Sequence, residues 1–306
     1  MNRKRKRSIM YYYKLFGLTV KSEFEIPEAV AIDALDTPDV LIESGMPPKE
    51  DFDAAQSGVI DRLEKDVCWF NLAKYGMFYV ENGNHVIIHS YGDEMTDLQR
   101  NSYLTGSTMG LVMFQRGIIP IHSGAVAKDG KTVLVVGDSG SGKSTNTVRL
   151  REKGCLFVSD DMSPVSFVDG KVMISPAFPQ QKLCRDAALR QGYQLEDLIY
   201  IDEDRDKYAI RLQDGYETED TELSMILELE ATDTEEFSIT EVRGLEKIKL
   251  IYRNIYRGCV WNVIGMQEEV QRHVLELAQK VPMYKCMRPN KGFYTEQITD
   301  WVLQHM

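Results

Sequence analysis

Short runs of alternating hydrophobic and polar residues follow one another through the first hundred positions of the chain. Such runs, bounded by glycine, proline or polar residues, are typical of β-strands. The sequence Asn82-Gly83-Asn84 stands between two of them and has the residues that favour a tight hairpin turn. We therefore expect a β-rich N-terminal domain over residues 10–96. The runs cover residues 11–20, 38–43, 68–73, 76–80 and 85–90.

The pattern changes to a helical period at residues 97–116, where residues 109–114 are apolar enough to be buried. Gly117 follows as a residue suited to end a helix in the left-handed conformation. We expect this helix to begin a second domain, which covers residues 97–306.

Strands and helices alternate in the second domain, which predicts an α/β fold. Asp129-Gly130 and Asp169-Gly170 each separate two apolar runs and predict hairpins. An acidic segment at residues 202–222 is expected to be a solvated loop or the exposed face of a hairpin. The expected strands are residues 118–127, 132–136, 156–159, 164–168, 171–175, 222–229 and 282–287, and the expected helices are residues 144–153, 244–257 and 266–280.

Charge is distributed unevenly along the 306 residues. The chain has 36 basic and 47 acidic residues, a formal net charge of −11. Five of the basic residues lie in residues 1–9, which we expect to form a basic flexible tail, and the rest of the chain carries −16. A body this acidic is unsuited to nucleic-acid polymers and anionic membranes, and no apolar run is long enough to span a bilayer. Small molecules, peptides and proteins remain as partners.

The five cysteines are scattered along the chain and form no C-x-x-C pair. Their odd number and wide spacing argue against a disulfide framework and against a zinc site. Free thiols are typical of a reducing compartment, so we expect a cytoplasmic protein.

A glycine-rich segment matches the phosphate-loop pattern G-x-x-x-x-G-K-[ST] in full, with an expected strand before it and an expected helix after it. The glycines allow main-chain N–H groups to converge on phosphate oxygens, toward which the positive end of the helix also points. Lys143 is expected to reach the β- and γ-phosphates of ATP, and the Ser144 hydroxyl to bind Mg²⁺; the alternative is a glycine-rich turn with a chance lysine. The expected nucleotide-binding residues are Gly137, Asp138, Ser139, Gly140, Ser141, Gly142, Lys143, Ser144 and Thr145.

Two aspartates, Asp160 and Asp161, directly follow the expected strand at residues 156–159. That strand is predicted to run beside the phosphate-loop strand and to bring both carboxylates to the same edge of the sheet. One carboxylate would bind Mg²⁺ and the other would accept a proton from an incoming hydroxyl; the alternative is an Asx turn or a helix cap. His122, on the strand before the phosphate-loop strand, fits a core position and a site position equally well.

The combination of these motifs resembles the HPr kinase/phosphorylase superfamily. The resemblance rests on the block from His122 to Val126, on the phosphate loop and on Ser159-Asp160-Asp161. Further segments are similar to HPr-kinase-related proteins found with peptide-modification clusters, so the similarity covers nearly all of residues 10–306. These segments are residues 10–17, 115–117, 179–186, 206–208, 252–257 and 281–285.

The resemblance implies a P-loop kinase domain of the phosphoenolpyruvate-carboxykinase-like type, with a mixed, largely antiparallel sheet. It implies Mg²⁺-dependent transfer of the γ-phosphate of ATP to a serine hydroxyl of a peptide or small protein. Some relatives phosphorylate lasso-peptide precursors, and others phosphorylate the carrier protein HPr. The resemblance implies that His122, like Lys143, lies near the γ-phosphate. It also implies that one of the two aspartates is the general base and that the other helps to hold the metal ion. We assign Asp160 as the base, and Asp161 with Ser144 as metal ligands.

One signature of the superfamily is altered in this chain. Its bifunctional members carry an E-[LIV]-R-G-[LIV]-G segment that is tied to dephosphorylation. The similar residues 241–246 lack the last glycine and lie much farther from the phosphate loop. We interpret them as a coincidence, which argues against phosphorylase activity and against HPr as the substrate.

Five basic residues beyond the loop are candidates for contacts with phosphate or substrate, and for each the alternative is a surface salt bridge. Two other functions stay open, a kinase of a small hydroxylated metabolite and a scaffold that senses nucleotide without transferring phosphate. The sequence also leaves a homo-oligomer open. The five candidates are Lys182, Arg185, Lys207, Arg253 and Arg257.

Overall fold

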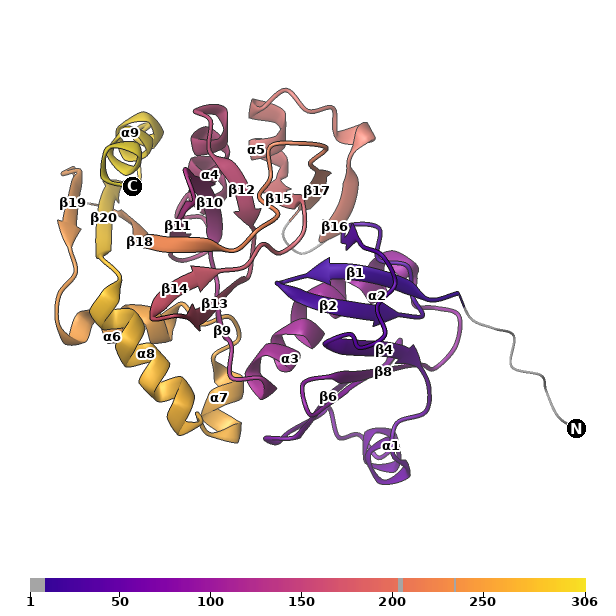
Figure 1. Cartoon of the computed structure of the whole chain (residues 1–306). Coiled ribbons are helices and arrows are strands. Elements are labelled where there is room, and N and C mark those ends of the chain that lie inside the picture. The colour runs from indigo at the N-terminus through magenta and orange to yellow at the C-terminus, as the bar shows by residue number, and fades with distance from the viewer. Residues whose placement is uncertain (1–8, 203–205, 234) are drawn as a thin grey trace, which may run out of the picture. The chain divides into compact units, whose positions relative to one another are not determined.

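The computed structural model describes residues 9–202, 206–233 and 235–306 (Figure 1). Its internal contacts divide the chain into two compact units. The first unit extends to Arg116 and includes Val260–Gly265, and the second consists of Gly117–Cys259 and Met266–Met306. The expected basic tail, apart from residue 9, lies outside the described residues.

The helical segment at residues 97–116 belongs to the first unit, whereas we expected it to begin the second domain. The ring of Tyr103 lies 6.2 and 5.8 Å from the rings of Phe70 and Phe78 on the first sheet, which accounts for the difference. The predicted helix is confirmed, with a π-helical turn at its centre, and Gly117 takes a φ of 70° after it. The helical elements of this unit are α1 (Lys49–Gln56), α2 (Asp97–Tyr103), the π-helical turn (Leu104–Thr108), α3 (Met109–Gln115) and α7 (Cys259–Ile264), of which Cys259 is counted in the second unit.

The first unit is built on a mixed sheet of eight strands in the order β3-β1-β2-β4-β8-β7-β6-β5. Residues 11–20, predicted as one strand, belong to a hairpin of two, because Phe16 and Gly17 take φ values of 55° and 77° and reverse the chain. A phenylalanine is uncommon in that conformation, so the sequence gives little sign of the turn. The strands are β1 (Tyr11–Leu15), β2 (Leu18–Ser22), β3 (Val30–Ala31), β4 (Val40–Ser44), β5 (Asp61–Leu63), β6 (Val67–Leu72), β7 (Gly76–Glu81) and β8 (His85–Ser90).

The second unit contains a nine-stranded mixed sheet in which β12-β10-β11-β18-β14-β13-β9 form the main path, and β20 pairs with β18 and β19. Among the described strands of this sheet, both parallel pairs involve β18, one with β11 and the other with β20. The predicted mixed α/β fold is confirmed. The strands are β9 (Ile119–Ile121), β10 (Gly124–Lys128), β11 (Lys131–Val136), β12 (Leu156–Ser159), β13 (Ser163–Val168), β14 (Lys171–Ile174), β18 (Thr221–Thr232), β19 (Ser238–Glu241) and β20 (Met283–Pro289).

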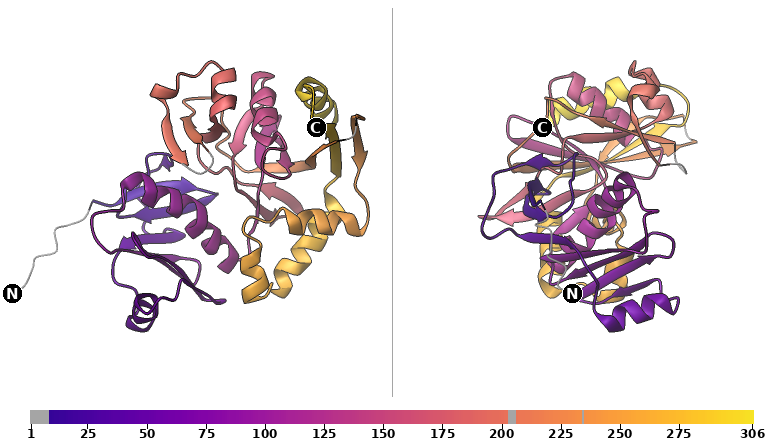
Figure 2. Two further views of the ribbon diagram at one scale, coloured as in Figure 1. Left: turned by 180° about the vertical axis from the view of Figure 1, so that it is seen from behind. Right: turned by 90° about the vertical axis from the view of Figure 1, so that its right-hand side faces the viewer.

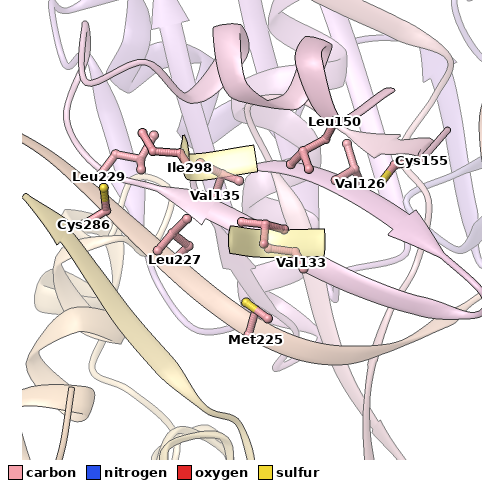
Figure 3. Close-up of a cluster of buried hydrophobic side chains, with 11 residues drawn as sticks. Val126, Val133, Val135, Leu150, Cys155, Met225, Leu227, Leu229, Cys286 and Ile298 are labelled. Carbon is pink, nitrogen blue, oxygen red and sulfur yellow. The ribbon is translucent and has the colours of Figure 1, made fainter. Parts of the chain in front are cut away.

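Alternate residues of β11 and β18 form a hydrophobic core cluster of the second unit together with helices α4 (Lys143–Glu152) and α9 (Thr295–His305). These two helices contact each other (Figures 1 and 2). Figure 3 shows Leu227 and Leu229 of β18 in this core. Because successive side chains of a strand point to opposite faces, Glu228 between them points away from α4.

A second, three-stranded antiparallel sheet was not predicted. Its order is β15-β17-β16, and its central strand lies inside the acidic segment 202–222 that we expected to be a loop or an exposed hairpin face. Tyr208, Ala209 and Ile210 of that strand are buried, and residues 203–205 lie outside the described part of the chain. The elements of this region are β15 (Gln180–Cys184), α5 (Arg185–Arg190), a 3₁₀ turn (Leu195–Asp197), β16 (Ile199–Asp202) and β17 (Lys207–Arg211).

Two further helices complete the second unit, α6 (Leu245–Arg253) and α8 (Glu268–Lys280). The helix predicted over residues 244–257 ends at Arg253, where the side chain of Asn254 donates to the Leu250 carbonyl at 2.9 Å. Within the described ranges, no helix is both long enough and apolar enough for a transmembrane span.

Candidate active site

The glycine-rich loop joins the end of β11 to the start of α4, the order that the sequence predicted. Gly137 has a φ of 130°, and a Cβ atom at this position would lie 2.3 Å from the carbonyl oxygen of Leu229. Gly142 has a φ of 109° and lies directly before α4. Both positions therefore require glycine, the first because the loop passes so close to β18.

Lys143, the first residue of α4, folds its side chain back over the loop. Its Nζ donates to the carbonyl oxygens of Gly137 and Asp138 at 2.6 and 3.2 Å. Burial lowers the pKa of Lys143, and the charges of Asp160 and Asp161 oppose that shift. The loop lysine is thus within electrostatic range of both carboxylates.

Asp160 and Asp161 follow β12, but β12 does not lie beside the phosphate-loop strand as we expected. β10 lies between them and is antiparallel to both β11 and β12. Because two reversals restore the direction, β11 and β12 still end at the same edge of the sheet. Asp161 takes a φ of 69°, an uncommon conformation for a residue other than glycine.

Three buried serines hold the strands at this edge together. The hydroxyl of Ser163 lies 2.6 Å from that of Ser123 and 2.5 Å from that of Ser159. Ser159 directly precedes the aspartates and Ser123 directly follows His122, so these hydrogen bonds fix the two segments relative to each other.

Lys182 on β15 contacts both carboxylates with different groups. Its main-chain N–H donates to Oδ2 of Asp160 at 2.7 Å, and its ammonium group donates to Oδ2 of Asp161 at 2.6 Å. Burial and the charge of Asp161 raise the pKa of Asp160 to about 6. Burial also works against ionisation of Asp161, but the charges of Lys182 and Lys207 outweigh it and hold the pKa of Asp161 well below its usual range. The two neighbouring carboxyl groups are therefore chemically unequal.

His122 lies in a break that the sequence did not predict, between β9 and β10, which we expected to be one strand. Its main-chain N–H donates to the main-chain carbonyl oxygen of Asn254 at 2.6 Å, and the Nδ1 atom of its ring lies 2.8 Å from the main-chain carbonyl oxygen of Asp161. Burial and the charge of Lys143 lower the pKa of His122. Since a carbonyl oxygen only accepts, Nδ1 carries the proton, and the neutral ring leaves Nε2 as an acceptor.

The five candidate substrate contacts have different surroundings. Lys182 and Lys207 act on the carboxylate pair, the first by direct contact and the second through its charge. Arg185 forms an exposed ion pair with Asp206 at 2.5 Å, which is the salt-bridge alternative. Arg257 has a φ of 48° and lies over the ring of Tyr256, whose centroid is 6.1 Å from that of His122.

Arg253 is paired with Glu228, a buried residue that sequence reasoning missed. Its Nε donates to one oxygen of Glu228 at 2.5 Å and its Nη2 donates to the other. Asn254 donates to Glu228 at 3.3 Å as well as accepting from His122. Glu228 is paired in register with Val136, the residue before the glycine loop, so this ion pair adjoins the loop. The sequence feature that could have pointed to Glu228 is the position of an acidic residue within a mostly apolar strand.

A cavity of about 350 Å³ opens beside the glycine loop. It is lined by Gly140, Gly142, Asn146, Arg288 and Phe293, among other residues of α4, α5 and the segment after β20. Arg288 donates to the Ser141 carbonyl through Nε at 3.0 Å and Nη2 at 2.9 Å, and Phe293 is 89% exposed. Neither residue belongs to a recognisable motif, so neither was predicted.

The donor chemistry of the expected metal ligands suits Mg²⁺. Ser144 and Asp161 offer hard oxygen atoms, and Mg²⁺ commonly uses one or two protein oxygens together with phosphate oxygens and water. In the part of the chain that the structure describes, no group of three or more His, Cys, Asp or Glu residues is arranged to hold a metal ion.

No family model matches the sequence, and no curated protein is significantly similar to it. Among solved structures, the chain is similar to the HPr(Ser) kinase/phosphatase from Coxiella burnetii. The two are 13% identical, the match covers 61% of this chain and 95% of that chain, and the TM-score is 0.33.

Proposed function

We propose that this chain is an ATP-dependent kinase that transfers the γ-phosphate to a serine hydroxyl of a peptide or small protein. The observation that supports the proposal is that β11, which leads to the loop with Lys143, and β12, which leads to Asp160 and Asp161, end at the same edge of the sheet. Phosphoryl transfer needs little more from a protein than positioning, neutralisation of charge and a proton acceptor.

The nucleotide phosphates would lie on the glycine loop, where the N-terminus of α4 and the ammonium group of Lys143 attract negative charge. The cavity beside the loop would take the nucleoside. The exposed aromatic ring of Phe293 could stack on the nucleobase there. Arg288 would stabilise the glycine loop through its hydrogen bond to the Ser141 carbonyl oxygen.

In the transfer step, the acceptor oxygen forms a bond to the γ-phosphorus while the bond to the bridging oxygen breaks and ADP leaves. Asp160 accepts the hydroxyl proton, which suits a carboxyl group whose pKa is raised to about 6. Asp161 and Ser144 would hold Mg²⁺, which neutralises phosphate charge when bound. Lys143 would stabilise the negative charge of the β- and γ-phosphates, and His122 is expected to lie near the γ-phosphate.

The net charge of −16 outside residues 1–9 favours a neutral or basic acceptor, since strongly acidic partners would be repelled. A small hydroxylated metabolite would use the same residues. A nucleotide-sensing scaffold would bind ATP without transferring phosphate. Binding alone does not need two carboxyl groups with different pKa values, so this difference favours the kinase over the scaffold.

The test is transfer of labelled γ-phosphate to a panel of serine peptides and a panel of hydroxylated metabolites. We expect Lys143→Met to abolish transfer and Asp160→Asn to lower it roughly 100-fold or more. Lys171→Met, which alters an exposed lysine paired with Glu222, is the control and should keep full activity. An Asp160→Asn rate within about threefold of the wild type would show that another group is the base, since such a loss is far below that of a general base. Binding of ATP without transfer to any acceptor would favour the scaffold.

A further inference from the structure

The contacts of Lys182 set it apart from the other basic residues of the site. It holds Asp160 with its main-chain N–H and Asp161 with its ammonium group, at 2.7 and 2.6 Å. The first contact depends on the backbone alone and survives any substitution except proline. The second contact depends on the flexible four-carbon side chain of the lysine.

The backbone of Lys182 is firmly placed. β15 pairs with β17 so that Lys182 lies opposite Ala209. The neighbouring Gln181 is buried, donates to the Thr147 hydroxyl of α4 at 3.1 Å and accepts from Arg151 at 3.0 Å. The main-chain contact to Asp160 is therefore fixed, whereas the ammonium group can leave Asp161 without moving the strand.

The ammonium group occupies an oxygen of the residue that we assign to Mg²⁺. A bound Mg²⁺ would lie about 2.1 Å from its carboxylate oxygen, so both cations on the same oxygen would be close neighbours. Two positive charges a few ångströms apart in a half-buried site repel each other strongly. Asp161 therefore cannot hold both cations well.

We propose that the Lys182 ammonium group and the divalent cation are alternative partners of Asp161. The ammonium group neutralises Asp161 while no metal is bound and moves away when the metal binds, and the Lys182 N–H keeps Asp160 in place in both states. This role rests on the proposed function only in that Asp161 is taken as a metal ligand.

A consequence is that free cation binds weakly to the empty site. The cation alone must displace Lys182, whereas a cation that arrives with ATP brings phosphate oxygens as further ligands. The lysine thus couples metal binding to nucleotide binding.

The test measures Mn²⁺ binding to the full chain without nucleotide, by electron paramagnetic resonance of the free ion. We expect Lys182→Met to bind Mn²⁺ about tenfold more tightly than the wild type, because a positive charge beside Asp161 is removed. Asp161→Asn in the Lys182→Met background should abolish the gain. Lys182→Arg keeps the charge and should bind Mn²⁺ as weakly as the wild type, and Lys171→Met is the control for loss of a distant lysine.

Lys182→Met that binds Mn²⁺ no more tightly than the wild type would overturn the proposal, as would a gain that persists in the double variant. If thermal unfolding shows that Lys182→Met does not fold, Lys182→Gln, which also lacks the charge, decides the question with the same expectation. None of these measurements needs phosphate transfer. A chain that shows the expected Mn²⁺ pattern but transfers no phosphate would contradict the proposed function alone.

Discussion

The ion pair between Arg253 and Glu228 allows a quantitative prediction for stability. The Glu228 side chain is 7% exposed and that of Arg253 is 43% exposed. Removal of one partner from a buried ion pair costs about 3–5 kcal/mol, because the remaining charge stays buried without compensation. Water reaches the exposed part of this pair and screens it, so we expect Arg253→Met to cost about 2–3 kcal/mol of unfolding free energy. For a domain of this length, that loss lowers the Tm by roughly 4–12 °C.

Two further variants separate the buried charge from other effects of the substitution. In Glu228→Met/Arg253→Met both charges are replaced by apolar side chains, and we expect a stability within about 1 kcal/mol of the wild type. Arg243→Met removes an arginine whose ion pair with Glu241 is exposed on both sides, and its cost should stay below about 1 kcal/mol.

Equilibrium unfolding in urea, followed by circular dichroism, measures all four proteins. The reasoning predicts a large loss for Arg253→Met, a recovery in the double variant and little change for Arg243→Met. If Arg253→Met costs no more than Arg243→Met, Glu228 does not depend on its partner. If the double variant is as unstable as Arg253→Met, the loss comes from missing packing rather than from an unpaired charge.

Two more predictions concern the glycine loop and the first unit. Gly137→Ala should cost roughly 3 kcal/mol or more, because its Cβ would collide with the Leu229 carbonyl, whereas Gly140→Ala, with open space around it, should cost about 1 kcal/mol; equal losses in thermal unfolding would contradict the steric argument. Burial works against a charged His85, but its hydrogen bonds to Glu81 and Glu43 outweigh it and raise the pKa of His85. The pKa of a histidine in an unfolded chain is about 6.5, and below that pH the raised pKa of His85 makes its full contribution to stability. The contribution disappears as the pH rises through the pKa of His85 in the folded protein. The stability difference between wild type and His85→Gln in urea should therefore be largest below about pH 6.5 and shrink as the pH rises above that value, and a constant or growing difference would refute it.

The parts of the fold that the sequence predicted correctly have strong local signals. The strand before the glycine loop is a run of valine and leucine, and the loop glycines mark where it ends. The hairpin between β13 and β14 follows from Asp169-Gly170, both of which take positive φ values. In each case the residues at the boundary decide the backbone conformation locally, so no tertiary information is needed.

The elements that escaped prediction depend on contacts distant in sequence. Residues 118–127 read as one apolar strand, yet β9 pairs with β13 and β10 pairs with β11 and β12. The chain changes partners at His122 and Ser123, where the Ser163 hydroxyl and the Asn254 carbonyl accept or share hydrogen bonds. Neither partner can be inferred from the pattern around His122. β17 was hidden for a related reason, because its buried residues lie inside a segment whose composition is dominated by acids.

The properties of the aspartate pair also depend on contacts with residues that are distant in the sequence. Asp160 and Asp161 are adjacent and chemically identical, so the residue pattern alone gives no physical reason for the two roles that we assigned to them. Their surroundings differ because β15 places one lysine across both, with a main-chain N–H on Asp160 and a full positive charge on Asp161. Burial and the charge of Asp161 raise the pKa of Asp160 to about 6, whereas the charges of Lys182 and Lys207 outweigh burial and keep Asp161 ionised. Lys182, a residue that the sequence offered only as a contact for substrate, thus contributes with Lys207 to the asymmetry that the proposed reaction needs.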